Sequence, residues 1–442
     1  MNGGKLPEGW VETPLENIVE ILDSMRIPVN NKERQKRIEG KDFNKLYPYY
    51  GATGEVGKID DFIFDEELIA LGEDGVPFFD GQKNKAYMLY GKTWVNNHAH
   101  VLKAIQGLSH NKFLCYFLNQ FDYHDYVNGG TRLKLTQANM RKIPVRFAPF
   151  SEQKIIAEKL DTLLAQVDIT KARLEQIPQI LKRFRQVVLA AIVNGKLSTN
   201  TEQWKVYSLK NLCVSISDGD HQAPPKSETG IPFLVISDVN KGKIDLENVS
   251  RWVPESYYLA LKEIRKPSLN DILYTVTGSF GIPVVVNTTK PFCFQRHIAI
   301  IKPNSNLINY RFLLFYLESP QIFKHASDVA TGTAQKTVSL SSLRNFELSV
   351  PSLKEQAVIV HRVEQLFAYA DTIEKQVNNA LTRVNNLTQS ILAKAFRGEL
   401  TAQWRAENPS LISGENSATA LLERIKAERA ASSGKKSSRK KA

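Results

Sequence analysis

The sequence predicts an α+β protein in which two domains of one mixed α/β fold are separated by two long antiparallel helices that form a coiled coil. Three observations lead to this prediction. Residues 151–197 and 354–400 align without a gap at a constant offset of 203 residues. Both stretches carry a heptad pattern of apolar residues, which is typical of coiled-coil helices. The segments in front of them share several short motifs, so an internal pseudo-twofold repeat is expected.

The repeated stretch predicts two helices that pack on each other. Glu152-Gln153 of the first copy aligns with Glu355-Gln356 of the second. Seam residues then recur at alternating spacings of four and three, which keeps them on one side of a helix. Because an apolar stripe is unstable in water, we expect each helix to bury it against the other. The expected seam consists of Ile156, Leu160, Leu163, Val167, Thr170, Leu174, Ile177, Leu181, Phe184 and Val188, and of Ile359, Val363, Leu366, Ala370, Ile373, Val377, Ala380, Val384, Leu387 and Ile391.

The repeat divides the chain into five expected segments. They are a domain, a long helix, a second domain, a second long helix, and a C-terminal helix with a basic, disordered tail; in chain order they span 1–149, 150–197, 198–350, 351–405 and 406–442. Short β-branched and aromatic runs bounded by Gly, Asn or Asp predict strands inside both domains. These runs are 68–71, 93–95, 101–104, 232–236, 272–276, 283–286 and 298–301.

A shorter motif occurs three times. Gly-Lys-Leu or Gly-Glu-Leu stands at 4–6, 195–197 and 398–400, and a tryptophan follows each copy, at Trp10, Trp204 and Trp404. The third copy has no folded segment of similar size after it. We therefore expect it to lie beside the N-terminus, in the place that the middle copy takes beside the second half.

Composition favours a cytoplasmic protein with a polyanionic partner. The 442 residues have 42% hydrophobic content and no apolar run of membrane-spanning length. The three cysteines lie far apart without metal-ligand spacing, which fits a reducing compartment. The net charge of +12 suggests a polyanionic partner. Part of this charge lies in the C-terminal tail, where it could serve solubility alone.

A search for catalytic motifs yields only weak candidates. The stretch 52–58 resembles a phosphate-binding loop, but Ala52 replaces its first glycine and Ile59 stands where the magnesium-binding hydroxyl is needed. His98 and His100 could be metal ligands on one face of a strand, yet neither a cysteine nor a clear carboxylate completes the set. We expect an ordinary turn in the stretch 52–58. We expect His98 and His100 to find hydrogen-bond partners within the domain.

Two glycine-threonine loops are the better candidates for function. The run Gly130-Thr131-Arg132-Leu133-Lys134 parallels Gly332-Thr333-Ala334-Gln335-Lys336, and both runs precede a long helix. Arginine can read guanine, glutamine can read adenine, and lysine or threonine can hold a phosphate. The alternative is that both are ordinary polar turns. The predicted DNA-binding residues are Gly130, Thr131, Arg132, Lys134, Gly332, Thr333, Gln335 and Lys336.

With these repeats, the chain resembles the specificity subunit of a type I restriction–modification enzyme, in the enterobacterial, K-12-like subgroup. The resemblance covers almost the whole chain. Its most specific portions are LPEGW at 6–10, SEQKIIAEKLDTLLAQVD at 151–168, and the second copy of the repeat through to Arg405. The two domains resemble target-recognition domains, whose sequences vary with the DNA that is read.

The resemblance implies a subunit that is not itself an enzyme. Each recognition domain would read one half of a bipartite, asymmetric site in double-stranded DNA, and the helix pair would set the gap. Two modification subunits would supply adenine-N6 methylation with S-adenosylmethionine. Two restriction or motor subunits, with ATP and magnesium, would complete the restriction enzyme. No cofactor, metal or membrane contact is expected in this chain itself.

The outward helix faces are candidate docking surfaces for these partners, because two identical subunits need two equivalent sites. Lys171, Arg173, Lys182 and Arg185 are the candidates, and a solvated face is the alternative. The rival to DNA recognition is a coiled-coil scaffold that joins two protein-binding domains. A second rival is a nucleotide-hydrolysing enzyme that uses the stretch 52–58.

Overall fold

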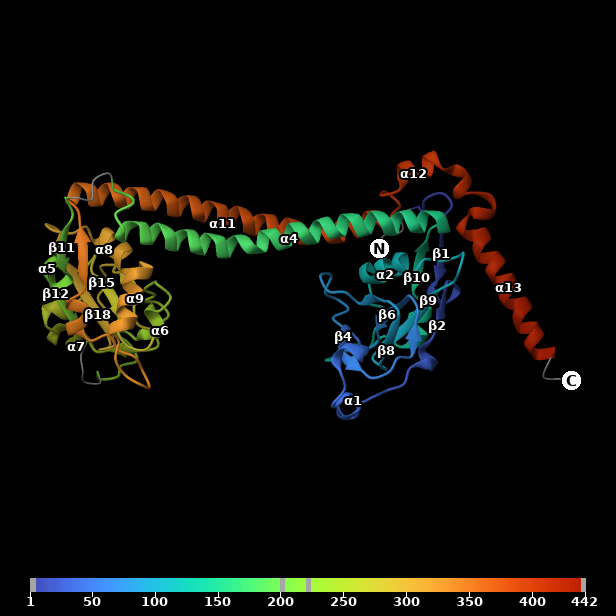
Figure 1. Ribbon diagram of the computed structural model, residues 1–442, viewed down its shortest axis with the longest axis horizontal. Helices are drawn as coiled ribbons and strands as arrows, with labels where there is room; N and C mark the ends of the chain where they lie inside the picture. Colours follow the sequence, from blue (N-terminus) through green and yellow to red (C-terminus); the bar gives the residue numbers. More distant parts are fainter. Residues whose placement is uncertain (1–4, 199–202, 220–223, 439–442) are drawn as a thin grey trace. The chain divides into compact units, whose positions relative to one another are not determined.

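The computed structural model describes residues 5–198, 203–219 and 224–438, and it divides into two compact units (Figure 1). Unit 1 comprises Met1–Glu175 and Asn379–Ala442, and unit 2 comprises Gln176–Asn378. The long helices α4 (Phe150–Val193) and α11 (Leu353–Phe396) each contribute residues to both units. Within the described ranges, no helix combines the length and apolar character needed to cross a membrane.

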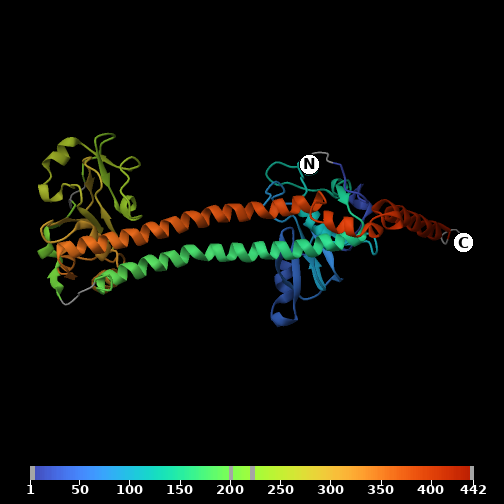
Figure 2. The same cartoon turned by 90° about the horizontal axis from the view of Figure 1, so that it is seen from above.

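The two long helices pack against each other within each unit (Figure 2). This confirms the packing that the heptads predict. Thr170 and Leu387 depart from the pattern, because both side chains are exposed; the Thr170 hydroxyl instead donates to the Gln166 carbonyl, 2.8 Å away. The paired apolar residues are Leu160, Leu163, Val167, Val384, Ile391 and Leu392 in unit 1, and Phe184, Val188, Ile359, Val363 and Leu366 in unit 2.

Unit 1 contains two four-stranded sheets and a two-stranded ribbon. The first sheet is antiparallel throughout, and its central strand β6 is buried at every position, as expected when both faces are covered. In order, its strands are β2 (Val19–Ile21), β9 (Ala99–Ala104), β6 (Leu68–Gly72) and β7 (Ala86–Leu89). The second sheet is β4 (Gly54–Ile59), β3 (Tyr47–Gly51), β8 (Lys92–Val95) and β5 (Phe64–Asp65), and the ribbon is β1 (Val11–Pro14) with β10 (Pro144–Phe147).

Unit 2 repeats this plan. Its antiparallel sheet is β12 (Cys213–Asp218), β18 (Ile298–Pro303), β15 (Ile272–Thr275) and β16 (Pro283–Val285). Its second sheet is β14 (Trp252–Val253), β13 (Ile231–Leu234) and β17 (Cys293–Phe294), and its ribbon is β11 (Lys205–Ser208) with β19 (Glu347–Val350). Each second sheet holds one parallel pair, β3 with β8 and β13 with β17. The prediction of one fold in both domains is therefore confirmed.

The helices show where the two domains agree and where they differ. Equivalent pairs are α2 (Asn111–Gln120) with α8 (Tyr310–Leu317) and α3 (Gln137–Arg141) with α10 (Leu340–Arg344). Helix α5 (Leu209–Leu212) takes the place of the 3-10 turn Leu15–Asn17, because Leu209 and Leu15 donate to the equivalent carbonyls of Phe346 and Ile143. Unit 1 adds α1 (Asn31–Ile38), and unit 2 adds α6 (Ile236–Val239), α7 (Glu255–Ala260) and α9 (Pro320–Val329). These added helices are attached to the sheets that both domains share, and they give the two domains different surfaces.

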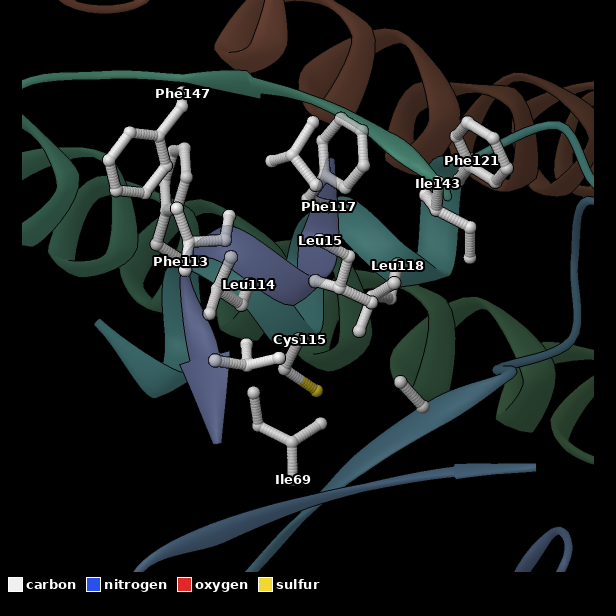
Figure 3. Packing of buried hydrophobic residues seen from close by; sticks show 14 of the residues in the cluster. Leu15, Ile69, Phe113, Leu114, Cys115, Phe117, Leu118, Phe121, Ile143 and Phe147 are labelled. Carbon is white, nitrogen blue, oxygen red and sulfur yellow. The ribbon is translucent and has the colours of Figure 1, made fainter. Parts of the chain in front are cut away.

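Helix α2 forms the centre of the apolar core of unit 1 (Figure 3). Phe113 and Phe117, four residues apart on one face, each have a ring centroid 5.3 Å from that of Phe396 on α11. Leu114 and Leu118 on the same helix are also fully buried. The domain is therefore joined to the long helices by a continuous core, not by a flexible linker.

The repeated glutamine has the same structural role in both halves. The side-chain oxygen of Gln153 accepts from the His110 backbone N–H at 2.9 Å, and its amide donates to the Leu108 and Ala148 carbonyls. Gln356 accepts from the Asn309 N–H at 2.7 Å and donates to the Leu307 and Pro351 carbonyls. Each glutamine therefore ties the start of a long helix to the loop before α2 or α8 and to the residue that directly follows the preceding strand.

The third copy of the short motif lies in unit 1, as predicted. Glu152 is fully buried there and accepts hydrogen bonds from Trp10 Nε1 at 2.8 Å, Thr401 Oγ1 at 2.5 Å and Arg405 Nη1 at 2.5 Å. In the second half, the Ser198 hydroxyl donates to the corresponding Glu355. Residue 4 of the first copy and residue 202, the counterpart of Arg405, lie outside the described residues. The buried carboxylate thus joins the N-terminal strand, α4 and the C-terminal segment.

The C-terminal segment differs from the prediction in extent. After α12 (Ala402–Glu407), helix α13 spans Ala418–Ser438, so it continues into the basic tail for which the sequence predicted disorder. Residues 432–438 consist of four serines, two lysines and one glycine, so local helix propensity does not explain this continuation. At its start, Leu421, Leu422 and Ile425 join the core of unit 1.

Candidate nucleic-acid interface

The two glycine-threonine loops have the same backbone conformation. Asn128 and Lys134 exchange backbone hydrogen bonds of 3.0 and 2.8 Å across the first loop, and Thr331 and Thr337 do so with the same two lengths across the second. Gly129 and Gly332 have φ angles of +117° and +113°. An added Cβ at either glycine would lie 2.4 Å from a backbone carbonyl oxygen, that of Arg132 or of Gln335.

This geometry corrects our alignment of the loops. The glycine-threonine runs pair Gly130 with Gly332, but the glycine with the positive φ in the first loop is Gly129. Only glycine adopts this conformation without strain or a clash, so Gly129 and Gly332 are equivalent. Arg132 then corresponds to Gln335, at the same offset of 203 residues as the helices. The composition of the run GGTR did not indicate which glycine was the structural one.

Backbone hydrogen bonds hold each loop on the body of its domain. In unit 1, Gly75 donates to the Leu133 carbonyl at 3.1 Å and Leu135 donates to the Glu73 carbonyl at 2.7 Å. In unit 2, the equivalent bonds run from Gly278 to Lys336 at 2.9 Å and from Val338 to Val276 at 2.8 Å. The predicted DNA-binding residues Gly130, Thr131, Arg132, Lys134, Gly332, Thr333, Gln335 and Lys336 are all exposed. A rigid base therefore carries a solvent-facing tip in both domains.

Carboxylates in unit 1 orient the cations of the first loop. Arg132 Nη2 lies 2.7 Å from Asp74 Oδ1, and His98 Nδ1 lies 3.0 Å from the same oxygen. Lys134 Nζ lies 3.1 Å from Glu73 Oε1. Burial alone would raise the pKa of Asp74, but hydrogen bonds from Arg132 and His98 outweigh it and hold this pKa below its usual value. Arg132 is thus held in one position while remaining 64% exposed.

The second loop has no such carboxylates. Thr277 and Thr337 occupy the positions of Asp74 and Lys134, and their hydroxyl oxygens are 3.3 Å apart. Among the described residues, the side chains of Gln335 and Lys336 form no hydrogen bond or ion pair. The two loops therefore present different chemistry on the same backbone: a preoriented guanidinium in unit 1, and a neutral amide beside a free ammonium in unit 2.

His100 belongs to a buried polar network behind the first loop. Its Nδ1 lies 2.7 Å from Asp23 Oδ2, and its Nε2 lies 2.9 Å from the Leu135 carbonyl oxygen. Gln137 Nε2 also donates to Asp23 Oδ2 at 2.9 Å. The sequence did not reveal the carboxylate partner of His100, because Asp23 lies 77 residues earlier in the chain. The network stabilises the point at which the loop returns to the domain.

Replacing Asp23 with asparagine should reduce the acid dependence of stability. Burial alone would raise the pKa of Asp23, but hydrogen bonds from His100, Gln137 and the Val101 N–H lower it below its usual value. A carboxylate with a depressed folded-state pKa stabilises the protein above the unfolded-state pKa and loses this effect as the pH falls below ~4. We expect Asp23→Asn to lose ~1–3 kcal/mol of unfolding free energy at pH 7 and to flatten the decline below pH ~4. Urea unfolding between pH 3 and 7 measures the unfolding free energy and its decline with acid. An unchanged decline in the variant would contradict a lowered pKa of Asp23.

The stretch that resembled a phosphate-binding loop has a structural explanation. Residues 54–59 form strand β4, and the turn is confined to residues 52 and 53. Gly57 has a φ of +151°, and a Cβ there would lie 2.4 Å from Arg34 Nη1. Arg34 donates to the Lys58 carbonyl at 3.1 Å. The glycine therefore makes room for a guanidinium.

The four candidate partner-binding residues are in different environments. Arg173 and Lys182 are exposed on α4, and Lys171 lines a cavity of about 370 Å³ in unit 1 together with Asp168 and Asn385. Arg185 instead lies 2.6 Å from Asp371 and 3.1 Å from Glu374 on α11. Its charge is therefore engaged in holding the two helices together in unit 2.

Comparisons with known proteins identify the family. The model of the type I restriction modification DNA specificity domain matches twice, at residues 7–179 and 201–383. The chain is 52% identical to the EcoBI specificity subunit of Escherichia coli over 66% of both chains, and 40% identical to the EcoKI specificity subunit of E. coli K12 over the full length of both. The HsdS subunit of Thermoanaerobacter tengcongensis has the same fold, with a TM-score of 0.60 at 18% identity over 90% of this chain and 99% of that one. The two matching segments and the full-length identity show that this chain belongs to the family of type I restriction–modification DNA specificity subunits.

Proposed function

We propose that this chain is the DNA sequence-recognition subunit of a type I restriction–modification complex. Each domain reads one half of a bipartite, asymmetric site, and the long helices set the gap between the halves. The observation that carries the proposal is the pair of equivalent loops with different side chains. One backbone framework that holds two sets of polar side chains suits two different half-sites.

The loop chemistry suits DNA. Arg132 has a planar guanidinium that can donate two hydrogen bonds to guanine, and Gln335 has an amide that can pair with the edge of adenine. Lys134 and Lys336 supply charge for phosphate, and Thr131 and Thr333 supply hydroxyl donors. Because Arg132 and Gln335 occupy equivalent positions, the two half-sites should differ in sequence.

The catalytic steps belong to partner chains in this proposal. The relatives are named as specificity subunits of type I restriction enzymes, which supports assembly with other subunits of such a system and with DNA. We propose two modification subunits, which use S-adenosylmethionine for adenine-N6 methylation, and two restriction or motor subunits, which use ATP and magnesium. Lys171, Arg173 and Lys182 are the proposed docking residues, whereas Arg185 is occupied by the helix pair. Assembly takes place in the cytoplasm.

Methylome sequencing of cells that express this chain with its modification subunit tests the proposal. We expect adenine methylation at a single bipartite, non-palindromic motif with an unread central gap. Methylation without any sequence preference would overturn the proposal and favour the scaffold alternative.

Substitutions in the loops should act on one half-site each. Gln335→Ala and Lys336→Ala should weaken recognition of the half read by unit 2, and Arg132→Ala that of the other half. Each lost base contact should cost ~1–3 kcal/mol, whereas loss of a phosphate contact should mainly reduce the salt dependence. Competition with duplexes mutated in one half at a time separates the effects. Equal loss at both halves would contradict modular reading.

A further inference from the structure

A polar groove opens on unit 1 beside the first loop. It has a volume of about 470 Å³ and is lined by residues of α1, β3, β4 and the β8–β9 turn. We call it the α1 groove. Its polar lining consists of Asn30, Asn31, Arg34, Asn96, Asn97 and His98, and the largely buried Tyr49 also borders it. Because His98 also contacts Asp74, the groove continues directly from the carboxylate that orients Arg132.

Helix α1 is held on the domain by polar contacts rather than by apolar burial. The guanidinium of Arg34 donates to the Lys58 carbonyl and lies 5.3 Å from the Tyr49 ring centroid. The guanidinium of Arg37 lies 4.7 Å from the Trp94 ring centroid. Arg37 Nε also donates to Asp60 Oδ1 at 2.7 Å. These contacts use two of the four cations of α1 to fix its position. The helix is therefore a rigid wall of the groove although it has no buried residue.

The other two cations of α1, Lys32 and Lys36, point to solvent with no ion pair among the described residues. Glu33 is the only acidic residue of this eight-residue helix. The helix lies at the end of unit 1 remote from α4 (Figure 1), and both lysines are exposed on it. An exposed basic helix that borders a polar groove is complementary to a nucleic-acid backbone.

The groove contains an unpaired amide at a position where the two domains differ. Asn97 is exposed, and its side chain has no hydrogen-bond partner among the described residues. His98 and His297 are equivalent, because each accepts a matching backbone hydrogen bond. The Glu73 N–H donates to the His98 carbonyl at 2.8 Å, and the Val276 N–H donates to the His297 carbonyl at 2.9 Å. Asn97 therefore corresponds to Arg296. Asparagine and arginine are the side chains that pair best with adenine and guanine, respectively.

We propose that the α1 groove is a second DNA contact of the first domain, in which Asn97 reads a base edge of the half-site while Lys32 and Lys36 bind backbone phosphates. This inference rests on the proposed function and extends it from the loop to a composite surface. Arg132 contacts Asp74, and Asn97 adjoins His98 in the groove lining, so the Asp74–His98 pair connects the two positions from which one half-site is read. The equivalent residue Arg296 implies a different base at the corresponding position of the other half.

The test uses the full chain in complex with its modification subunits, with Asn97→Ala and Lys32→Ala as the variants. Asn306→Ala and Lys426→Ala are the matched controls, because both residues are exposed and lie outside the groove. We expect Asn97→Ala to lower affinity about tenfold or more and to relax the methylated motif at a position in one half only. Lys32→Ala should weaken binding to all sequences and reduce the slope of log affinity against log salt by about one.

The outcomes separate this inference from the proposed function. A wild-type complex without a bipartite motif would overturn the proposed function itself. Asn306→Ala should leave the methylated motif unchanged. If Asn97→Ala also leaves it unchanged, or relaxes it in both halves, the groove assignment alone is overturned. Unchanged thermal unfolding of the variants shows that they fold. The lysine variant tests the groove independently of Asn97, since a salt slope equal to that of Lys426→Ala would exclude phosphate contact there.

Discussion

Replacing Glu152 with alanine should destabilise unit 1 by ~3–5 kcal/mol, because it leaves a partly buried cation and two buried donors without their acceptor. Trp10, Thr401 and Arg405 all direct hydrogen atoms to this carboxylate, and Glu152 itself is fully buried. The loss should release the C-terminal segment from the N-terminal strand. Urea unfolding of the full chain measures the free energy, and limited proteolysis measures release of the segment after α11.

The second half of the chain supplies the control for Glu152. Glu355 occupies the equivalent position but is partly exposed, and Ser198 donates to it. Glu355→Ala should therefore cost ~1 kcal/mol or less. A double-mutant cycle with Arg405→Met should show strong coupling to Glu152. Equal destabilisation by the two glutamate variants, or additive effects in the cycle, would show that the buried carboxylate does not hold the segment.

Phe396→Ala should cost ~3–5 kcal/mol, as expected for removal of a fully buried aromatic side chain. Phe396 is 1% exposed, and its ring contacts those of Phe113 and Phe117 on α2. The cavity left behind would separate the first domain from α11. Hydrogen exchange of α2 amides, together with the unfolding free energy, measures this loss.

Val193 is the position equivalent to Phe396 in the first long helix, and it is only partly buried at the edge of the core of unit 2. Val193→Ala should therefore cost about 1 kcal/mol. The contrast tests whether the aromatic contact, and not the end of a long helix in general, fastens the domain. Similar costs for both variants would contradict the assigned role of Phe396.

Several features could be predicted from the sequence because their signal is local and repeated. The heptad seam, apart from Thr170 and Leu387, and strands such as β6 and β15 appear where the pattern placed them. Helix α1 was missed because it has no apolar face; its residues pack through arginine stacking on Tyr49 and Trp94. Such contacts join residues that are distant in the chain and leave no periodic signal.

The glycine-threonine loops were likewise predicted only in part. Their existence and position were evident from the two glycine-threonine runs, but their register was wrong by one residue in the first loop. Two features resolve it, the positive φ of Gly129 and the backbone bridge between Asn128 and Lys134. Backbone conformation at a particular glycine depends on tertiary hydrogen bonds, which neighbouring residue types do not specify.

The sequence by itself determined the repeat, the pair of packed helices and the family, because a heptad pattern and a duplicated segment can be recognised from the order of residues alone. Only the tertiary structure decided which polar side chains meet. Asp23 with His100, Asp74 with Arg132, Glu152 with Arg405, and the groove beside α1 all join residues that are at least tens of positions apart. Hydrogen bonds and ion pairs act over a few ångströms in space, so their partners become known only when the chain is folded.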